Sequence, residues 1–503
     1  MKSLKVTHFF KAALWLGLIV LALLTRFYHL ENKPIHFDEG INGWFVLQMQ
    51  TLGFYKYDPN NYHGPLYFYL LRWSELLWGQ SLAVLRTVPA IFSFFSIFLF
   101  SYSILTERKM QRWMIFFVFL SPAFIFFGRS GIHEMPFVFF QLLLALGLLR
   151  WLERPDSKAL VLAVTGFWGL LVLKETFVIT LLCLGLGILS LGLGEVRKQL
   201  SWQKACAAWT PLVRSWVLFL ALFFVALYTG FFKNPWGLVD FFKALVPWLK
   251  TGVHGHGHEK EFAYWVKVLW QAEPLVLLGI VLALPGVVGK NKGLRVVSVF
   301  SLAQLLIYSL IPYKTVWCIL SLVWGFYFVL ALQLDRSKKN MWVLLGPVVL
   351  LAALNIYSAY RSAFKVPIDM THPYVYVNST YDLVAVQSAL TSAVQNNPQL
   401  LHTNIQIGHK EQWPWPWLVR SFTKVDYNVC GKRVSTNAFF YICDADDAPT
   451  VEAQLTQPYW KVTVELRQAK EGALVYFRKS DFPTIPLQGH AVLVGVDGVN
   501  NEK

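Results

Sequence analysis

The chain has 503 residues, of which 55% are apolar and only 15% are charged, whereas a soluble domain carries about 25% charged residues. This composition excludes a soluble enzyme, a disordered protein and a disulfide scaffold, and it predicts a polytopic α-helical membrane protein. The net charge is +16. Residues 361–503 hold 13 basic and 13 acidic residues, so the whole excess falls on the apolar part. Short cytoplasmic loops explain such an excess, and we expect no nucleic-acid partner.

About eleven apolar stretches follow one another in residues 1–360, and most approach the roughly 20 helical residues that cross a bilayer. They are residues 12–30, 82–104, 113–128, 135–150, 158–173, 176–194, 215–231, 264–288, 296–311, 315–334 and 341–360. The first ends near Arg26 without a small-residue cleavage site, which favours a retained anchor over a signal peptide. A further segment, 65–79, contains Arg72 and Glu75, so we expect an interfacial helix, with a spanning helix as the alternative.

Basic residues mark every second loop between these stretches. They begin with Lys2, Lys5 and Lys11 before the first stretch and end with Arg336, Lys338 and Lys339 after the tenth. Loops of this kind face the cytoplasm under the positive-inside rule. We therefore expect an integral protein of the cytoplasmic (inner or plasma) membrane, in contact with its lipids, with the N-terminus inside and residues 361–503 outside.

Residues 361–503 differ in character from the apolar part, so the chain divides into a transmembrane domain, 1–360, and an extracytoplasmic domain. Short strand-like runs alternate with helical patterns, which predicts a small α/β domain. The runs are 374–378, 404–408, 438–443, 460–466 and 473–477, and the helical patterns are 382–396 and 449–456. Cys430 and Cys443 both fall in this domain, where a disulfide and two buried thiols are equally open.

Polar clusters gather in the loops that this topology places outside. They are residues 36–40, 57–65, 128–135 and 312–315, together with a very short turn at Lys174-Glu175. Any one cluster is explained by solvated residues at the end of a span. Together they are more informative, because ionisable residues at membrane depth are costly and usually functional. Carboxylates with histidines suit a general base or a metal site, and isolated Lys and Arg suit phosphate.

Several motifs in and near these clusters occur together in one known family. They are Phe37-Asp38-Glu39, Tyr57-Asp58-Pro59, His63-Gly64-Pro65, Ser121-Pro122, Lys174-Glu175-Thr176, Tyr313-Lys314-Thr315 with Trp317, and Trp415-Pro416-Trp417-Leu418-Val419-Arg420. With them the chain resembles the GT-C superfamily of glycosyltransferases, and within it the protein-mannosyltransferase and aminoarabinose-transferase group. It is most similar to the branch known as flippase-activity-associated membrane proteins. The matches extend over most of the chain.

The resemblance implies a GT-C-like fold and the transfer of a sugar, hexosyl or pentosyl, from a polyprenyl-phosphate donor. The acceptor, a lipid, a glycan or a protein, would lie outside the cytoplasm, and the displacement would be inverting. Asp38 matches the acid that deprotonates the acceptor. Glu39, its neighbour, is placed beside it in the catalytic site.

The resemblance also suggests donor and substrate residues. The candidates for the donor phosphate are Arg129, Lys174, Tyr313 and Lys314, and those for substrate or a divalent metal (Mg, Mn or Zn) are His63, His133 and Glu134. One departure matters. The aminoarabinose-transferase pattern has Glu-Lys-Pro where this chain has His63-Gly64-Pro65. The donor specificity and the metal requirement of that group are therefore in doubt for this chain.

Three alternate histidines, His254, His256 and His258, lie in the long external loop between the seventh and eighth stretches. They suit a transition metal, although a mobile loop over the site is the favoured interpretation. Two other functions remain open for the whole chain. One is a transporter or flippase of lipid-linked sugars, although no inverted repeat is visible. The other is a noncatalytic accessory subunit that binds polyprenyl-phosphate lipids.

Overall fold

The structure is a computed structural model, and it describes residues 2–61, 63–101, 108–255, 257–336, 341–467, 471–484, 487 and 491–495. The chain divides into two compact units. The first consists of Met1–Leu30 and Phe45–Tyr374, and the second consists of Glu31–Trp44 and Val375–Lys503. Each unit is described by itself.

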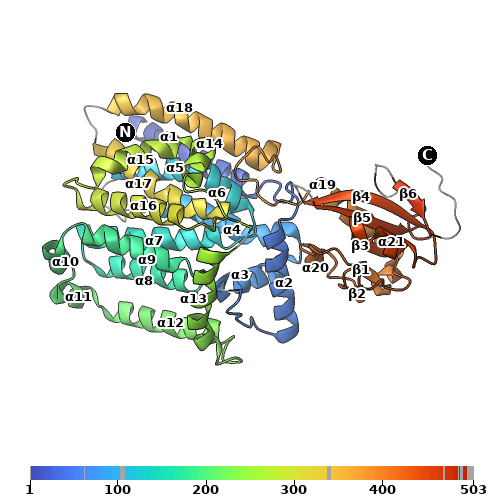
Figure 1. Cartoon of the computed structure of the whole chain (residues 1–503). Helices are drawn as coiled ribbons and strands as arrows, with labels where there is room; N and C mark the ends of the chain where they lie inside the picture. The colour runs from blue at the N-terminus through green and yellow to red at the C-terminus, as the bar shows by residue number, and fades with distance from the viewer. Residues whose placement is uncertain are drawn as a thin grey trace. The chain divides into compact units, whose positions relative to one another are not determined.

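The first unit is helical (Figure 1). Its helices are α1 (Lys2–Phe27), α3 (Pro65–Trp78), α4 (Leu82–Phe98), α5 (Arg108–Leu120), α6 (Pro122–Phe126), α7 (Glu134–Glu153), α8 (Ser157–Leu171), α9 (Phe177–Leu189), α10 (Leu193–Gln199), α11 (Trp202–Ala208), α12 (Pro211–Tyr228), α13 (Gly237–His254), α14 (Tyr264–Ala272), α15 (Pro274–Gly286), α16 (Lys292–Leu310), α17 (Ile319–Arg336) and α18 (Met341–Tyr360). Helix α2 (Phe37–Leu52) starts in the second unit and ends in the first. Short turns of 3₁₀ helix, such as Phe127–Arg129, connect several of these helices.

Every predicted apolar stretch contains a helix. In the part of the chain that the structure describes, five helices are long and apolar enough to cross a membrane: α7, α12, α16, α17 with the turn before it, and residues 343–365. Two bent pairs, one formed by α5 and α6 and one that starts with α9, raise the number to 7 if each pair is one span. The apolar helices in α1, α4, α8 and α15 are shorter. The helical architecture of the first unit is therefore confirmed, whereas its insertion in a membrane and the count of eleven spans stay predictions. Segment 65–79 forms the helix α3.

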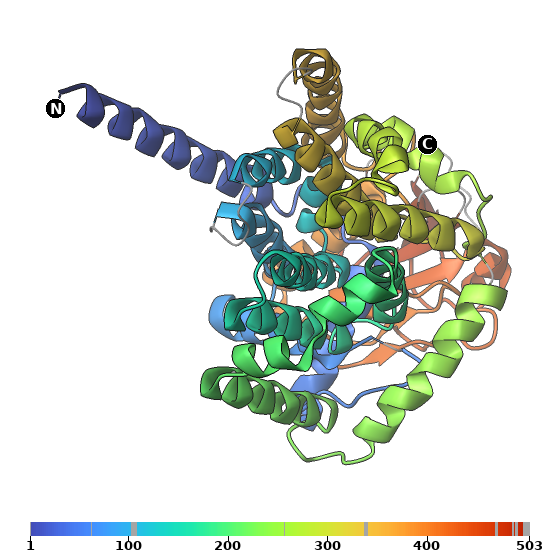
Figure 2. The ribbon, with the colours of Figure 1, turned by 90° about the vertical axis from the view of Figure 1, so that its left-hand side faces the viewer.

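Prolines and small residues explain where helices start and how closely they pack. Proline stands at the first position of α3, α6, α12 and α15, where its missing N–H costs nothing. Helix α8 lies along α7 (Figures 1 and 2). A Cβ on Gly147 would lie 2.4 Å from the backbone of Ala163, and one on Gly166 2.3 Å from that of Leu144. These glycines let the two backbones approach, as small residues do in membrane helices.

Helices α14 and α15 are separated by Glu273, which is fully buried. Its Oε1 accepts hydrogen bonds from the Ser121 hydroxyl at 2.8 Å and from the Ala123 N–H at 2.5 Å. Its Oε2 accepts from the Tyr327 hydroxyl at 2.5 Å and the Asn355 amide at 3.2 Å. The Glu273 carboxylate therefore makes hydrogen bonds to three helices, α6, α17 and α18, and joins them.

The second unit contains a mixed six-stranded sheet in the order β2-β1-β3-β5-β4-β6. The strands are β1 (Ile405–Ile407), β2 (Val425–Asp426), β3 (Phe440–Asp444), β4 (Tyr459–Arg467), β5 (Glu471–Arg478) and β6 (Ala491–Val494). Strand β1 is parallel to β2 and β3, and the other pairs are antiparallel. The unit's own helices are α19 (Tyr381–Asn396), α20 (Trp415–Leu418) and α21 (Ala448–Glu452).

This sheet corresponds to the small α/β domain expected from the sequence. Four of the five strand-like runs become β1, β3, β4 and β5, because these runs are rich in buried β-branched and aromatic residues. The run 374–378 forms no strand, and the short β2 and β6 were not expected. Cys430 and Cys443 form a disulfide with their Cα atoms 5.7 Å apart. Of the two possibilities for these cysteines, the structure has the bonded one.

Candidate active site

The first turn of α2 carries the two acids that the sequence suggests as catalytic. The peptide N–H of His36, just before the helix, donates to Glu39 Oε2 at 2.7 Å. Glu39 is fully buried, whereas the Asp38 side chain is 26% exposed. A glutamate at the third helical position that reaches back in this way closes the helix N-terminus as in a capping box. The two neighbouring acids thus differ, because Glu39 holds the turn and Asp38 is accessible.

His36 ties the start of α2 to the rest of the second unit. Its Nε2 lies 2.9 Å from the carbonyl oxygen of Tyr376, and its Nδ1 accepts the N–H of Asp38 at 3.1 Å. An acceptor Nδ1 assigns the ring hydrogen to Nε2, which donates to the carbonyl. Burial, with nearby Lys33, lowers the pKa of His36 to about 4. The ring is therefore neutral at neutral pH, and its 3.9 Å approach to Asp38 is not an ion pair there.

Because this pKa is below the ordinary 6.5, unfolding takes up a proton between about pH 4 and pH 6.5. Stability is therefore full above this window and falls as the pH drops through it, by up to about 1.4 kcal/mol per pH unit. We expect His36→Asn to reduce this dependence of the free energy of unfolding on pH. Chemical denaturation of the full chain at pH 4.5 and at pH 7 measures it. His402→Asn, which replaces an exposed histidine, is the control. Equal slopes for both variants and the wild type would contradict the assignment.

A second group of candidates lies in the first unit, where His63-Gly64-Pro65 meets the turn between α8 and α9. The N–H of Gly64 donates to Leu173 O at 3.0 Å, and His63 forms a β-bridge with Lys174. A Cβ on Gly64 would lie 2.3 Å from the backbone of Val172. The glycine of this motif is thus required for a close backbone approach, and the proline after it starts α3.

Lys174 and Glu134 form a buried ion pair at this place. Burial opposes the charge on Lys174, but the Glu134 carboxylate outweighs it and the pKa of Lys174 is raised. The His133 ring lies 4.5 Å from the His63 ring between centroids. Burial, together with His63 and Lys174, lowers the pKa of His133 well below its ordinary value, so this histidine is neutral. The structure therefore brings four predicted residues together: His63, His133, Glu134 and Lys174.

Glu175 and Tyr57 adjoin this group, although sequence reasoning assigned them no site role. The Tyr57 hydroxyl donates to Glu175 Oε1 at 3.2 Å, and both residues are buried. Burial raises the pKa of Glu175 to about 8, so its carboxyl group is protonated at neutral pH. Both residues belong to motifs of the family resemblance, which was the available signal. A protonated carboxyl can donate a hydrogen bond to a substrate oxygen.

Lys314 and Tyr313 lie in the turn before α17 and contact the segment after α13. The Lys314 ammonium donates to the carbonyl oxygens of Ile311 at 2.5 Å and Lys260 at 3.1 Å, and the residue is 2% exposed. The Tyr313 ring lies 4.9 Å from the His258 ring. Burial lowers the pKa of Lys314. Its charge is therefore held by neutral acceptors, unlike that of Lys174.

Arg129 has a different environment from the one expected of a phosphate ligand. Its guanidinium donates to the carbonyl oxygens of His29 at 2.9 Å and Arg26 at 3.4 Å, at the end of α1. It also lies 4.7 Å from the centre of the Phe364 ring. Cationic side chains commonly satisfy the last carbonyls of a helix. This environment holds α1 in place, and the phosphate role of Arg129 stays a prediction.

The metal candidates receive no geometric support. Among the described residues, no group of three or more His, Cys, Asp or Glu is placed to hold a metal ion. His254 is the exposed last residue of α13, His258 contacts Tyr313, and His256 lies outside the described residues. His63, His133 and Glu134 therefore fit a hydrogen-bonding site better than a metal centre. No step of the chemistry is derived through a metal.

Comparison with known proteins identifies the fold. No protein-family model matches the chain, and no curated protein matches it in sequence. Solved structures do match, among them two of ArnT from Cupriavidus metallidurans. The apo structure has a TM-score of 0.65 at 13% identity, covering 93% of this chain and 98% of ArnT. The structure bound to undecaprenyl phosphate has a TM-score of 0.63 at 12% identity, covering 92% and 97%. The chain therefore has the same overall fold as ArnT over nearly its whole length.

Proposed function

We propose that the chain is a membrane glycosyltransferase that takes a sugar from a polyprenyl-phosphate donor and passes it to an acceptor outside the cytoplasm. The observation that carries the proposal is the ArnT fold over 92–93% of the chain, with undecaprenyl phosphate bound to one of the two ArnT structures. The partly exposed carboxylate of Asp38 supplies a base for such a reaction. The flippase-activity-associated branch is the subgroup that the sequence motifs favour.

In the proposed reaction Asp38 accepts the proton of the acceptor nucleophile. The nucleophile attacks the anomeric carbon from the face opposite the phosphate, and the bond between that carbon and the phosphate oxygen breaks. The polyprenyl phosphate leaves with the bonding electrons, and the configuration at the sugar is inverted. Glu39 takes no proton in this scheme, because its carboxylate closes the helix on which Asp38 stands.

The donor phosphate is assigned to Lys314, with Tyr313 beside it. The Lys314 ammonium donates to two neutral carbonyls, and a charged acceptor makes a stronger hydrogen bond than a neutral one. An exchange of a carbonyl for the phosphate is therefore favourable. Lys174 is less suited, because Glu134 already compensates its charge. In this scheme His63, His133 and Glu175 contact the sugar or the acceptor through hydrogen bonds.

The experiment that tests the function is a transfer assay with purified full-length protein and synthetic polyprenyl-phosphate sugars. We expect release of polyprenyl phosphate together with a glycosylated acceptor or free sugar. Movement of the intact donor across a vesicle membrane without cleavage would instead identify a flippase. Binding of the donor with neither cleavage nor movement would identify an accessory subunit. A divalent metal remains a prediction of the family resemblance, and loss of transfer in chelator, restored by Mn²⁺ or Zn²⁺, would establish it.

The proposed reaction requires the second unit to lie outside the cytoplasm, with the N-terminus inside, in the inner or plasma membrane. Cys206 is an exposed native thiol in α11, between the sixth and seventh apolar stretches, where the charge pattern places the chain inside. Gln454→Cys places a second exposed thiol in the outer domain. In intact cells an impermeant maleimide should label the cysteine at 454 and leave Cys206 unlabelled until the membrane is opened. The reverse labelling would place Asp38 in the cytoplasm and contradict the proposal.

A further inference from the structure

The start of α2 belongs to the same compact unit as the C-terminal sheet, although residues in contact there, such as His36 and Tyr376, are 340 positions apart in the sequence. His36 forms a β-bridge with Asn378, and its ring is hydrogen-bonded to the carbonyl of Tyr376. These contacts hold the residue two positions before Asp38. Further contacts of this turn come from the aromatic segment 413–417 and from the end of β4.

The segment 413–417 packs directly on the first turns of α2. A Cβ on Gly40 would lie 2.5 Å from the Cβ of Pro414, and one on Gly43 would lie 2.2 Å from the Trp417 ring. Trp417 is 2% exposed. Both glycines are therefore needed for this approach, since a larger residue would displace the helix or the segment. Trp413 lies against Trp44 and Trp417 against Gly43, so two tryptophans of this segment cover the turn of α2 that directly follows Asp38 and Glu39.

Arg467, the last residue of β4, joins these parts. One amino group of its guanidinium donates to the Trp413 carbonyl at 3.1 Å and to Glu411 Oε2 at 3.2 Å. The guanidinium carbon also lies 4.8 Å from the centre of the Phe37 ring. Phe37 immediately precedes Asp38. A planar guanidinium can stack on a ring and still donate hydrogen bonds in its plane, which an ammonium cannot do.

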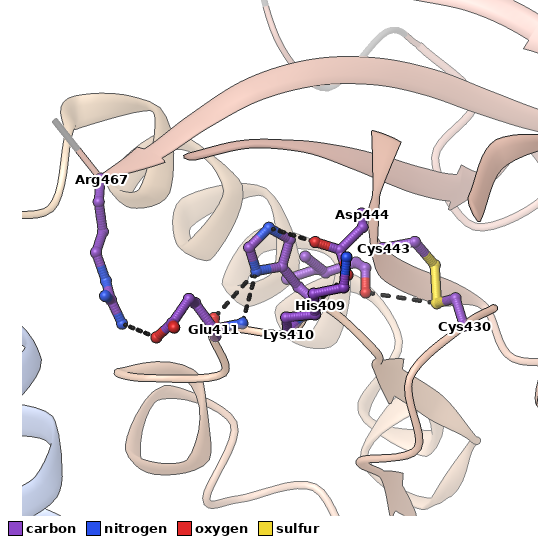
Figure 3. A network of polar contacts seen from close by, with 8 residues as sticks. His409, Lys410, Glu411, Cys430, Cys443, Asp444 and Arg467 are labelled. Atoms are coloured by element: carbon purple, nitrogen blue, oxygen red, sulfur yellow. Dashed lines mark hydrogen bonds and ion pairs between the residues drawn. A yellow bond between two sulfur atoms is a disulfide. The ribbon is translucent and has the colours of Figure 1, made fainter. Parts of the chain in front are cut away.

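The partner of Arg467 is itself fixed in place (Figure 3). The N–H of Glu411 donates to His409 Nδ1 at 3.0 Å, and His409 Nε2 lies 3.3 Å from Asp444 Oδ1. Asp444 follows Cys443, whose disulfide to Cys430 lies beside the same loop. The contacts continue from the disulfide through His409 and Glu411 to Arg467, so the guanidinium has little freedom to move away from Phe37.

We propose that Arg467 is a positioning residue of the active site, which holds Asp38 in place through Phe37 and the segment 413–417. The inference rests on the proposed function, because it assigns to Asp38 the role of the base. It gives the C-terminal domain a task in the reaction, which is to set the position of a group on α2. A misplacement of about 1 Å in a catalytic group can reduce the rate about 100-fold. Loss of this contact should therefore appear in turnover.

The test compares Arg467→Lys, Arg467→Gln and Phe37→Leu with the wild type in the transfer assay. We expect kcat to fall about 10- to 100-fold in all three, with the KM for the donor unchanged, because none of these residues binds the donor. Arg467→Lys keeps the charge and should not rescue. The control is Lys461→Gln, which removes an ion pair with Glu452 on the same strand and should leave kcat unchanged. Wild-type kcat in Arg467→Lys would overturn the proposal.

A double-mutant cycle separates this inference from the proposed function. If Arg467 acts through Asp38, adding Arg467→Gln to Asp38→Asn should cause no further loss, whereas equal losses in both backgrounds would overturn the positioning role. If Asp38→Asn alone leaves turnover unchanged, the base is wrong. Amide hydrogen exchange of residues 36–44 then still decides the structural claim. Exchange there should rise in Arg467→Gln and Phe37→Leu but not in Lys461→Gln, and unchanged exchange in all three would refute the contact.

Discussion

Asp38→Asn should lower the turnover of the purified enzyme by about 10²- to 10⁴-fold, the usual contribution of a side-chain general base. The substitution keeps the shape of the side chain and removes its ability to accept a proton. The hydrogen bond from the Asp38 peptide N–H to His36 Nδ1 does not involve the Asp38 side chain and therefore remains. The KM for the donor should change little, since Asp38 acts on the acceptor. Initial rates of transfer measured over a range of donor concentrations give both constants.

A matched variant distinguishes catalysis from helix stability. Asp38 and Asp240 both lie in the first turn of a helix, α2 and α13 respectively. Loss of a negative charge there weakens a helix by about 0.3–1 kcal/mol. Asp240→Asn should therefore resemble Asp38→Asn in its effect on the melting temperature and retain full turnover. Near-wild-type turnover in Asp38→Asn would remove Asp38 as the base and direct the search to Glu134.

Helices and strands of this chain are local features, and the sequence predicts them well. The apolar stretch 82–104, for example, contains α4, and the alternating run 460–466 becomes most of β4. The amphipathic helix α13 was not expected, because its apolar residues form one face and never a continuous run. Breaks inside spans, such as Glu273 between α14 and α15, were also missed. Pro274 is a local signal for this break, but the donors that satisfy the Glu273 carboxylate come from helices far away in sequence, which no local pattern contains.

In the candidate site, too, the sequence predicts local features but not the contacts between distant segments. The residue types of Asp38, Glu134 and Lys174 point to function, but their partners come from the fold. A glutamate at the third position of α2 is a capping-box signal, so the role of Glu39 could have been read from the sequence. The pairing of Glu134 with Lys174 could not, because 40 residues separate them. Arg467 lies in a strand that contains no motif. Only its packing against Phe37, at the start of α2 within the second unit, identifies it.

The buried pair of Glu134 and Lys174 carries the largest expected effect on stability. Glu134→Gln leaves the ammonium of Lys174 without its counter-charge in a site where the residue is 9% exposed. Removing one partner of a buried ion pair typically destabilises a protein by about 3–5 kcal/mol. The raised pKa of Lys174 should fall at the same time, since Glu134 maintains it. Denaturation of the full chain in detergent measures the loss. Glu261→Gln, which breaks the exposed pair with Lys267, should cost less than about 1 kcal/mol.

Removing both charges together separates the structural role of this pair from a role in transfer. In Glu134→Leu/Lys174→Met no charge remains buried, so stability should recover toward that of the wild type, as with other buried pairs replaced by apolar residues. If the pair serves only packing, turnover should recover as well. We expect turnover to stay low, because the neutral His133 ring and the His63 ring beside it lie against this pair and would lose the field that orients the sugar in the proposed reaction. A stable double variant with wild-type turnover would remove this cluster from the proposed active site.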